Sequence, residues 1–215
     1  MEKINIEEMT GRYPVLVPLM KQIESASDCL ISCYGKGGKV LVCGNGGSCS
    51  DSGHMVAELM KGFTMKRNLG SSLRNSLVEI AGKRGEYLAE NLQQGLPAIS
   101  LAAHSSLITA ISNDSDPGVI FAQQVTGYGN PDDILFGIST SGNARNVVDA
   151  AIVAKAKGMK VIGLTGKTGG LLKSYCDILI NVPEERTHLV QELHLPVYHT
   201  ICLIVEAAFF KVTDL

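Results

Sequence analysis

Five short apolar runs, separated by stretches long enough for helices, constrain the fold of this chain more than any other feature. They cover residues 39–43, 98–102, 133–139, 160–165 and 177–182. Each run is apolar almost throughout instead of alternating with polar residues, which is typical of strands covered on both faces of a sheet. Strands that alternate with helices form right-handed crossovers. The pattern predicts an α/β fold with a doubly wound five-stranded parallel sheet and helices on both faces.

Helical patterns precede and follow these runs. Residues 3–34 carry apolar positions at mostly three- and four-residue steps and lead into a glycine cluster at 35–38, which predicts an N-terminal helix that ends there. Residues 187–210 are apolar nearly all round in their second half, with Glu206 the exception. A helix of this kind is buried, either in the core or against another subunit.

One segment departs from the strand–helix pattern. Residues 67–95 are polar and charged, and the sequence predicts a helix over 72–94 between the first helix of the sheet and the second strand. This position indicates an inserted elaboration of the fold instead of a separate domain. No internal repeat or linker interrupts the chain, so we expect a single domain spanning residues 1–215.

Charge and composition argue against several classes of partner. The formal net charge is −2, aromatic residues make up 5% and Trp is absent, so neither a basic surface nor a stacking platform for nucleic acid is indicated. No apolar run approaches the roughly 20 residues that a membrane helix needs, and the first residues do not form a signal peptide. The six cysteines include no CxxC pair. Free thiols are typical of a reducing compartment, so we expect a cytoplasmic protein without nucleic-acid or membrane partners.

Two loops rich in glycine and hydroxyl groups follow expected strands. Residues 43–48 read CGNGGS after the first strand, and residues 139–143 read STSGN after the third. Parallel sheets bind ligands at the carboxyl ends of their strands, and the free N–H groups at the start of a helix favour an anion. Each loop alone could be only a tight turn, but two together favour a phosphate site. Neither matches a nucleotide-binding motif.

Acid–base side chains lie on the helix after the first loop. His54 and Glu58 are four residues apart and therefore share a face of that helix. A carboxylate near a histidine can serve as a general base and a general acid. A lone histidine on a helix is more often structural or exposed, so this reading needs further polar groups nearby.

The last helix supplies further polar groups. Gln191 and His199 are about two turns apart, on a broad face that also carries His188 and Glu192. Pro196 lies between them and could kink the helix. Gln191 and His199, together with His54 and Glu58, could hold a divalent metal such as zinc. The spacing alone does not show that the two helices meet.

The chain resembles the phosphoheptose (sedoheptulose-7-phosphate) isomerases of the sugar isomerase, or SIS, superfamily. The matching stretches, in family order, are CGNGGS at 43–48, HMVAE at 54–58, ISND at 111–114, STSGN at 139–143, GLTGKTGG at 163–170 and QELHLPVYH at 191–199. STSGN marks the superfamily, whereas CGNGGS with HxxxE and the late QExHxxxxH is far more specific to the heptose isomerases. The resemblance implies the flavodoxin-like SIS fold and an intramolecular aldose–ketose isomerase.

The resemblance also implies a role for each matching position. Glu58 would act as the base and His199 as its acid partner, in an enediol mechanism. Substrate contacts would come from Asn45, Gly46, Gly47, Ser48, Asn113, Asp114, Ser139, Thr140, Ser141 and Gln191. One zinc ion per subunit would be held by His54, Glu58, Gln191 and His199. The family assembles as homotetramers whose active sites are completed by neighbouring subunits, and the same is implied here.

Three departures from the family pattern bear on the substrate. Ala144 stands where the family usually has a serine that binds phosphate, and Arg145 could replace that contact. His188 stands where an aspartate is frequent, and the segment from Glu58 to Asp114 is longer than usual. We consider that the insertion could form a lid or wall over the site, or else an oligomer contact or a solvated helix.

Sedoheptulose 7-phosphate, converted into a manno-heptose 7-phosphate, is the expected substrate, with another phosphosugar as the alternative. A second alternative is a non-catalytic SIS protein that senses phosphosugars or binds a replication initiator. Such adaptors lack the glutamate of HxxxE and the last histidine, whereas Glu58 and His199 are both present in this chain.

Overall fold

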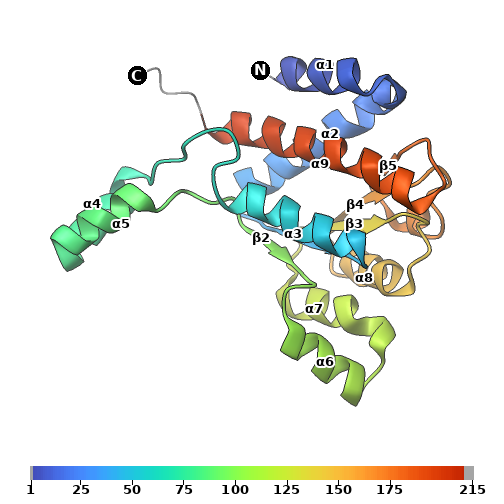
Figure 1. Ribbon diagram of the computed structural model, residues 1–215. Helices are drawn as coiled ribbons and strands as arrows, with labels where there is room; N and C mark the ends of the chain where they lie inside the picture. Colours follow the sequence, from blue (N-terminus) through green and yellow to red (C-terminus); the bar gives the residue numbers. More distant parts are fainter. Residues whose placement is uncertain (1, 211–215) are drawn as a thin grey trace.

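The computed structural model describes residues 2–210 and contains one parallel sheet of five strands (Figure 1). The strands are β1 (Val40–Gly44), β2 (Ala98–Ser100), β3 (Ile134–Ser139), β4 (Lys160–Thr165) and β5 (Ile178–Asn181). Their order across the sheet is β2-β1-β3-β4-β5, and all pairs are parallel. The predicted sheet is confirmed: four strands lie inside the runs that predicted them, and β1 extends one residue beyond its run, to Gly44.

Helices cover both faces of the sheet, as the apolar runs predicted. One face carries α2 (Met20–Gly35), α3 (Gly47–Met60) and α9 (Thr187–Phe209), whereas the other carries α7 (Ile120–Tyr128), α8 (Arg145–Ala156) and the short η3 (Leu172–Tyr175). Alternate strand residues serve the two layers, so Val42 packs toward α3 and α9, and Leu41 toward α7 and α8. The central strands β1 and β3 are therefore buried on both faces, whereas the edge strand β5 is mostly half-buried.

The N-terminal segment is broken, although a single helix over 3–34 was expected. It consists of α1 (Glu2–Arg12), the 3₁₀ helix η1 (Pro14–Leu19) and α2. Tyr13, which precedes Pro14, lies outside the helical region with φ −129° and ψ 72°. A proline removes an N–H donor and disfavours the helical region for the residue before it. The expectation was wrong there, while the predicted end at the glycine cluster is confirmed, since α2 ends at Gly35.

The insertion forms a helical hairpin instead of the single helix expected over 72–94. Helix α4 (Ser71–Ala81) is followed by α5 (Lys83–Asn91), with Gly82 between them at φ +50°. A Cβ at Gly85 would overlap the carbonyl oxygen of Leu77, so the two helices pack closely there. An antiparallel bridge between Asn68 and Gln93 closes the base of the hairpin, which projects away from the sheet (Figure 1).

The hairpin is attached at the opposite edge of the sheet from the two glycine-rich loops. Helix α3 starts at the carboxyl edge of the sheet and runs back to the amino edge, where Met60 precedes the insertion and Pro97 leads into β2. The inserted helices contact mainly each other. A lid over the loops of the same subunit was therefore a wrong expectation, whereas a contact with another subunit stays a prediction.

Helix α9 crosses the same face as α3 and runs through Pro196 without interruption. Its buried side chains include Val197, Ile201 and Val205, which belong to the core of this chain. The predicted burial is thus reached within the subunit. The remaining elements are α6 (Ser105–Asp114) and η2 (Pro117–Val119), which connect β2 to α7. Among residues 2–210, no helix is both long and apolar enough to cross a membrane.

Candidate active site

The two glycine-rich loops meet at the carboxyl edge of the sheet. They follow β1 and β3, which are neighbours, and they lead into α3 and α8. The chain passes from β1 to β2 on one side and then returns to β3 on the other, so the point between β1 and β3 is the topological switch point of the sheet. Ligands of open α/β sheets bind at such points. The expected placement of both loops is confirmed.

Amide groups join the two loops directly. Asn45 and Asn146 exchange reciprocal hydrogen bonds of 2.8 and 2.9 Å between their side-chain amides. Gly142, at φ +67°, lies so close to Gly169 that a Cβ would overlap its carbonyl oxygen, and the N–H of Gly166 donates to the carbonyl oxygen of Thr140 at 2.9 Å. The stretch at 163–170 therefore braces the loop at 139–143. Asn146 was missed because its position at the start of a helix is unremarkable in sequence.

The hydroxyl groups of the loops differ in exposure. Ser48 and Ser139 are buried at 3% and 5% exposure, Thr140 is half-buried, and Ser141 is exposed. The Ser141 hydroxyl accepts a hydrogen bond of 3.1 Å from the N–H of Asn143. Together with the N-termini of α3 and α8, these hydroxyls offer donors to an anion at the switch point.

The acid–base residues of α3 and α9 do come together. His54 Nε2 lies 3.2 Å from Glu58 Oε1 and 3.4 Å from His199 Nε2. The other Glu58 oxygen, Oε2, lies 3.3 Å from Lys61 Nζ. Burial, and next the neighbouring His54, lower the pKa of His199, while Glu58 acts in the opposite direction. A neutral His199 beside a carboxylate can both accept and donate a proton near neutral pH.

Gln191 reaches the same region from α9. Its side-chain amide lies against the backbone of Gly47 so closely that a Cβ there would overlap Nε2. Gly47 is thus needed to let α9 approach the first turn of α3. Gln191 therefore lies beside the first glycine-rich loop.

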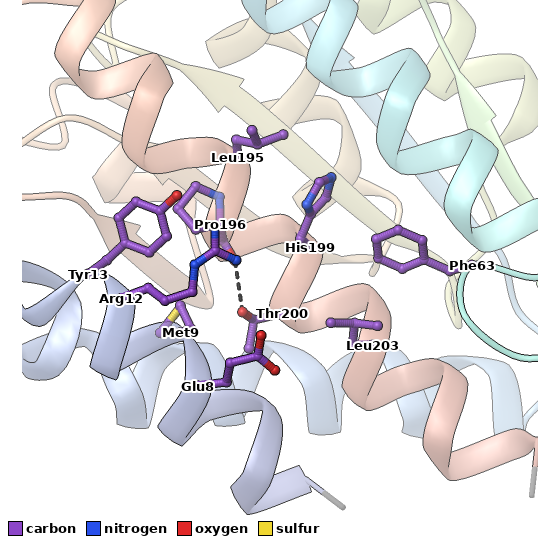
Figure 2. Close-up of a pocket in the computed structure, with 10 residues that line it drawn as sticks. All are labelled: Glu8, Met9, Arg12, Tyr13, Phe63, Leu195, Pro196, His199, Thr200 and Leu203. Carbon is purple, nitrogen blue, oxygen red and sulfur yellow. Dashed lines mark hydrogen bonds between the residues drawn. The ribbon is translucent and has the colours of Figure 1, made fainter. Parts of the chain in front are cut away.

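A cavity of about 300 Å³ opens beside His199, between α1 and α9. Figure 2 shows Arg12 and Glu8 on α1 facing Thr200 on α9, with Phe63 opposite His199. The rings of Phe63 and His199 have centroids 5.2 Å apart in an edge-on arrangement. His199 therefore borders open space on one side and His54 on the other.

Four expected residues lie outside this cluster. Asn113 and Asp114 end α6 with exposed side chains, and the Asn113 amide donates to the Asp114 carboxylate at 2.8 Å. Neither has a hydrogen bond to the glycine-rich loops within the described part of the chain. His188 and Glu192 are also exposed on α9. Their helical spacing was correct, but they face solvent instead of α3.

The departure at Ala144 can be located. Ala144 caps α8, and the next residue, Arg145, has a side chain that is 71% exposed. Its guanidinium pairs with Asp116 at 3.0 Å and lies 3.4 Å from Asp149. Part of its charge is therefore already compensated, which weakens the case that Arg145 alone replaces a phosphate-binding hydroxyl.

The donor chemistry of the cluster suits zinc in part. Two zinc ligands at bond lengths of about 2.0–2.1 Å in a tetrahedron lie roughly 3.3 Å apart. The distances from His54 Nε2 to Glu58 and to His199 match that spacing. Within residues 2–210, however, no group of three or more His, Cys, Asp or Glu side chains is arranged around one centre. The residues fit zinc pairwise, with His54 in the middle.

The comparison with known proteins decides the family. A model of the SIS domain matches residues 14–83 and 80–166. Phosphoheptose isomerases of Synechocystis sp. and Clostridium acetobutylicum are 38% and 39% identical, over 87% and 89% of this chain and 84% of each relative. The chain belongs to the phosphoheptose isomerase family. Solved phosphoheptose isomerases from Neisseria gonorrhoeae and Francisella tularensis have TM-scores of 0.74 and 0.75, at 31% and 34% identity, and cover 91% and 90% of this chain and the same shares of their own.

Family membership confirms the resemblance that the motifs indicated and makes this protein a sugar-phosphate isomerase. A carboxylate and an imidazole beside two glycine-rich loops are the kind of groups that such an enzyme can use for acid–base catalysis. Two further residues of this family member, Asp51 and Tyr198, lie behind His54 and were not expected from sequence. Asp51 could have been noticed three residues before His54, but Tyr198 carried no signal apart from adjacency to His199.

Proposed function

We propose that this phosphoheptose isomerase interconverts sedoheptulose 7-phosphate and a manno-heptose 7-phosphate through an enediol, with Glu58 as base and His199 as its acid partner. The observation that carries the proposal is the meeting of these two side chains around His54, next to two glycine-rich loops at a switch point. The relatives that share more than a third of the sequence are named phosphoheptose isomerases, which supports the choice of substrate.

The loops would bind the phosphate and thereby orient the sugar. Ser48, Ser139, Thr140 and Ser141 supply hydroxyls, and the helix N-termini supply N–H groups and a favourable dipole. Asn45 and Gln191 offer amides to the sugar hydroxyls. Binding energy from the phosphate, which does not react, holds the reacting carbons in place and lowers the barrier through orientation.

Proton transfer follows from the carboxylate and the imidazole. Glu58 would remove the proton from C1 of the ketose, the electron pair would form the C1=C2 double bond, and His199 would deliver a proton to the carbonyl oxygen at C2. In the second half, His199 would take the proton from the C1 hydroxyl and Glu58 would return its proton to C2. General acid–base catalysis of this kind contributes about 10²–10⁴-fold for each group.

Zinc belongs to the same proposal. His54, Glu58, Gln191 and His199 would hold one ion per subunit, with nitrogen and oxygen donors that zinc accepts. When bound, the ion would polarise the substrate oxygens as a Lewis acid. The homotetramer rests on the family resemblance, and the cytoplasmic location rests on the six free cysteines, which are typical of a reducing compartment.

Solvent-deuterium exchange tests the function. The purified protein is incubated with ketose phosphates of five, six and seven carbons in deuterated water, and exchange at C1 is followed by NMR. We expect exchange with sedoheptulose 7-phosphate and a loss of about 10²–10⁴-fold in Glu58→Gln. Glu192→Gln, an exposed glutamate on α9, is the matched control and should keep its activity. Full exchange in Glu58→Gln would contradict the mechanism, and exchange only with another sugar would correct the substrate.

A further inference from the structure

A tyrosine hydroxyl is enclosed between the two helices that carry the acid–base residues. Tyr198 on α9 is fully buried, and its hydroxyl lies 3.0 Å from His54 Nδ1 and 3.4 Å from Asp51 Oδ1, both on α3. Asp51 precedes His54 by three residues, so the two face α9 together. The contact thus joins a carboxylate, a hydroxyl and an imidazole in a row across the helix pair.

The chemistry of this row assigns a direction to its hydrogen bonds. An ionised carboxylate only accepts, so the Tyr198 hydroxyl donates to Asp51. The tyrosine oxygen then has its lone pair free to accept, and the nitrogen facing it, His54 Nδ1, must donate. A histidine with its proton on Nδ1 presents Nε2 on the other side of the ring. That nitrogen is the one within 3.4 Å of both Glu58 and His199.

We propose that Tyr198, oriented by Asp51, is a positioning residue that holds the ring proton of His54 on Nδ1 and keeps Nε2 directed at Glu58 and His199. Nε2 then keeps its lone pair for the metal of the proposed function. The inference rests on that function only for the use of Nε2. Histidines that bind metals commonly donate their second N–H to a carboxylate or another acceptor, which fixes the ring.

The surroundings of the Asp51 carboxylate support a role beyond packing. Asp51 Oδ2 is buried without a hydrogen-bond partner among residues 2–210, so Tyr198 supplies the hydrogen bond that Asp51 receives from a side chain there. A buried carboxylate oxygen without a hydrogen bond costs stability. An apolar residue would fill the volume of Asp51 at a lower cost in stability. The carboxylate is therefore better explained by its effect on the Tyr198 hydroxyl, which in turn fixes the ring proton of His54.

The experiment reads the His54 tautomer directly. Two-bond ¹H–¹⁵N correlation spectra of the metal-free protein, labelled at histidine nitrogens, report which ring nitrogen carries a proton. We expect a protonated Nδ1 at His54, and a shift of several-fold in population toward the Nε2–H tautomer in Tyr198→Phe and in Asp51→Ala. The matched control is Tyr34→Phe. It also removes a buried tyrosine hydroxyl, but one that, unlike that of Tyr198, has no hydrogen-bond partner among residues 2–210.

A cobalt titration gives the second readout. Loss of a partner behind a ligand typically weakens metal affinity about 10–100-fold, so Tyr198→Phe should raise the Kd for cobalt by that factor and Tyr34→Phe should leave it unchanged. An unprotonated Nδ1 in the parent protein, or an unchanged tautomer in both variants, would overturn the inference. If the parent protein shows the expected tautomer but no isomerisation, the proposed function fails and this inference stands.

Discussion

Two pairs of helices in this molecule are built in opposite ways. Helices α3 and α9 lie far apart in sequence, pack on the sheet and enclose polar groups between them. Helices α4 and α5 are joined by a single glycine and pack mainly on each other, and α4 contributes no buried side chain. Leu73, Ile80 and Tyr87 of that hairpin are exposed. The first pair is placed by the rest of the fold, whereas the second is held mainly by contacts between its own two helices.

A buried ion pair connects the two regions. Arg67, at the base of the hairpin, and Glu206, on α9, are 1% and 0% exposed and 2.8 Å apart. Arg67 also donates to the carbonyl oxygens of Leu59 and Glu58 at 2.6 and 2.8 Å. Glu206 accepts hydrogen bonds from residues 63 and 64. This network ties the end of α3 to α9 and so helps to set the spacing of the acid–base residues.

Removing one member of that pair should have the largest effect on stability. Breaking a buried ion pair leaves an uncompensated charge and costs about 3–5 kcal/mol. We expect Arg67→Met to lower the free energy of unfolding by that amount in urea titrations, and Arg74→Met, on the exposed face of α4, to change it little. The double variant Arg67→Met/Glu206→Leu should recover much of the loss. A loss below about 1 kcal/mol in Arg67→Met would show that the network contributes little to holding the helix pair together.

Acid should destabilise the folded chain through His194. This side chain of α9 is fully buried, and burial lowers its pKa to about 4, opposed in part by the backbone of Thr165. The unfolded chain takes up the proton near pH 6.5, before the folded chain does. Stability is therefore intact above about pH 6.5 and falls as the pH drops toward 4, by about 3 kcal/mol.

The His194 contribution is isolated by difference. His194→Leu should flatten the pH dependence of urea unfolding between pH 6.5 and 4, whereas His188→Leu, at an exposed position of the same helix, should leave it unchanged. The same slope in the parent protein and in His194→Leu would contradict the assignment.

Glycines in the two regions allow a paired test of activity. Gly47→Ala forces a Cβ into the space of the Gln191 amide, and Gly85→Ala forces one against the Leu77 carbonyl oxygen in the hairpin. We expect kcat/KM to fall about 10- to 100-fold for Gly47→Ala, because small misplacements at a reacting site are costly. Gly85→Ala should loosen the hairpin and spare activity. Equal activity in both variants would show that the position of Gln191 does not matter for substrate turnover.

The smallest effect is expected from removing the hairpin. Asn68 and Gln93 already face each other in an antiparallel bridge, so an Asn-Gly turn can replace residues 69–92. Because the hairpin packs mainly on itself, the free energy of unfolding of the subunit should change by less than about 1 kcal/mol. Light scattering would show whether the exposed apolar side chains hold subunits together. A loss above about 3 kcal/mol would mean that the two regions are not independent.

Much of the architecture was readable from the sequence. Short strands that are apolar throughout require two covering layers, so the parallel sheet and its helices followed from residue patterns alone. The two glycine-rich loops could be placed because parallel strands end at one edge. Local chemistry explains the two wrongly predicted helices as well, since Pro14 broke the first helix and Gly82 turned the inserted one. Both residues were visible, but helical periodicity was given more weight than these breakers.

Residue patterns were enough to predict the sheet, the two loops and the candidate acid–base residues, because strand patterns and motifs are properties of neighbouring residues. Which polar groups meet depends on the tertiary structure. His54 and His199 are 145 positions apart, and the sheet brings their nitrogens to 3.4 Å. Tyr198, Arg67 and His194 looked like ordinary helix or loop residues until packing enclosed them. Burial and contact between distant segments depend on the whole fold, which is why no local pattern could reveal them.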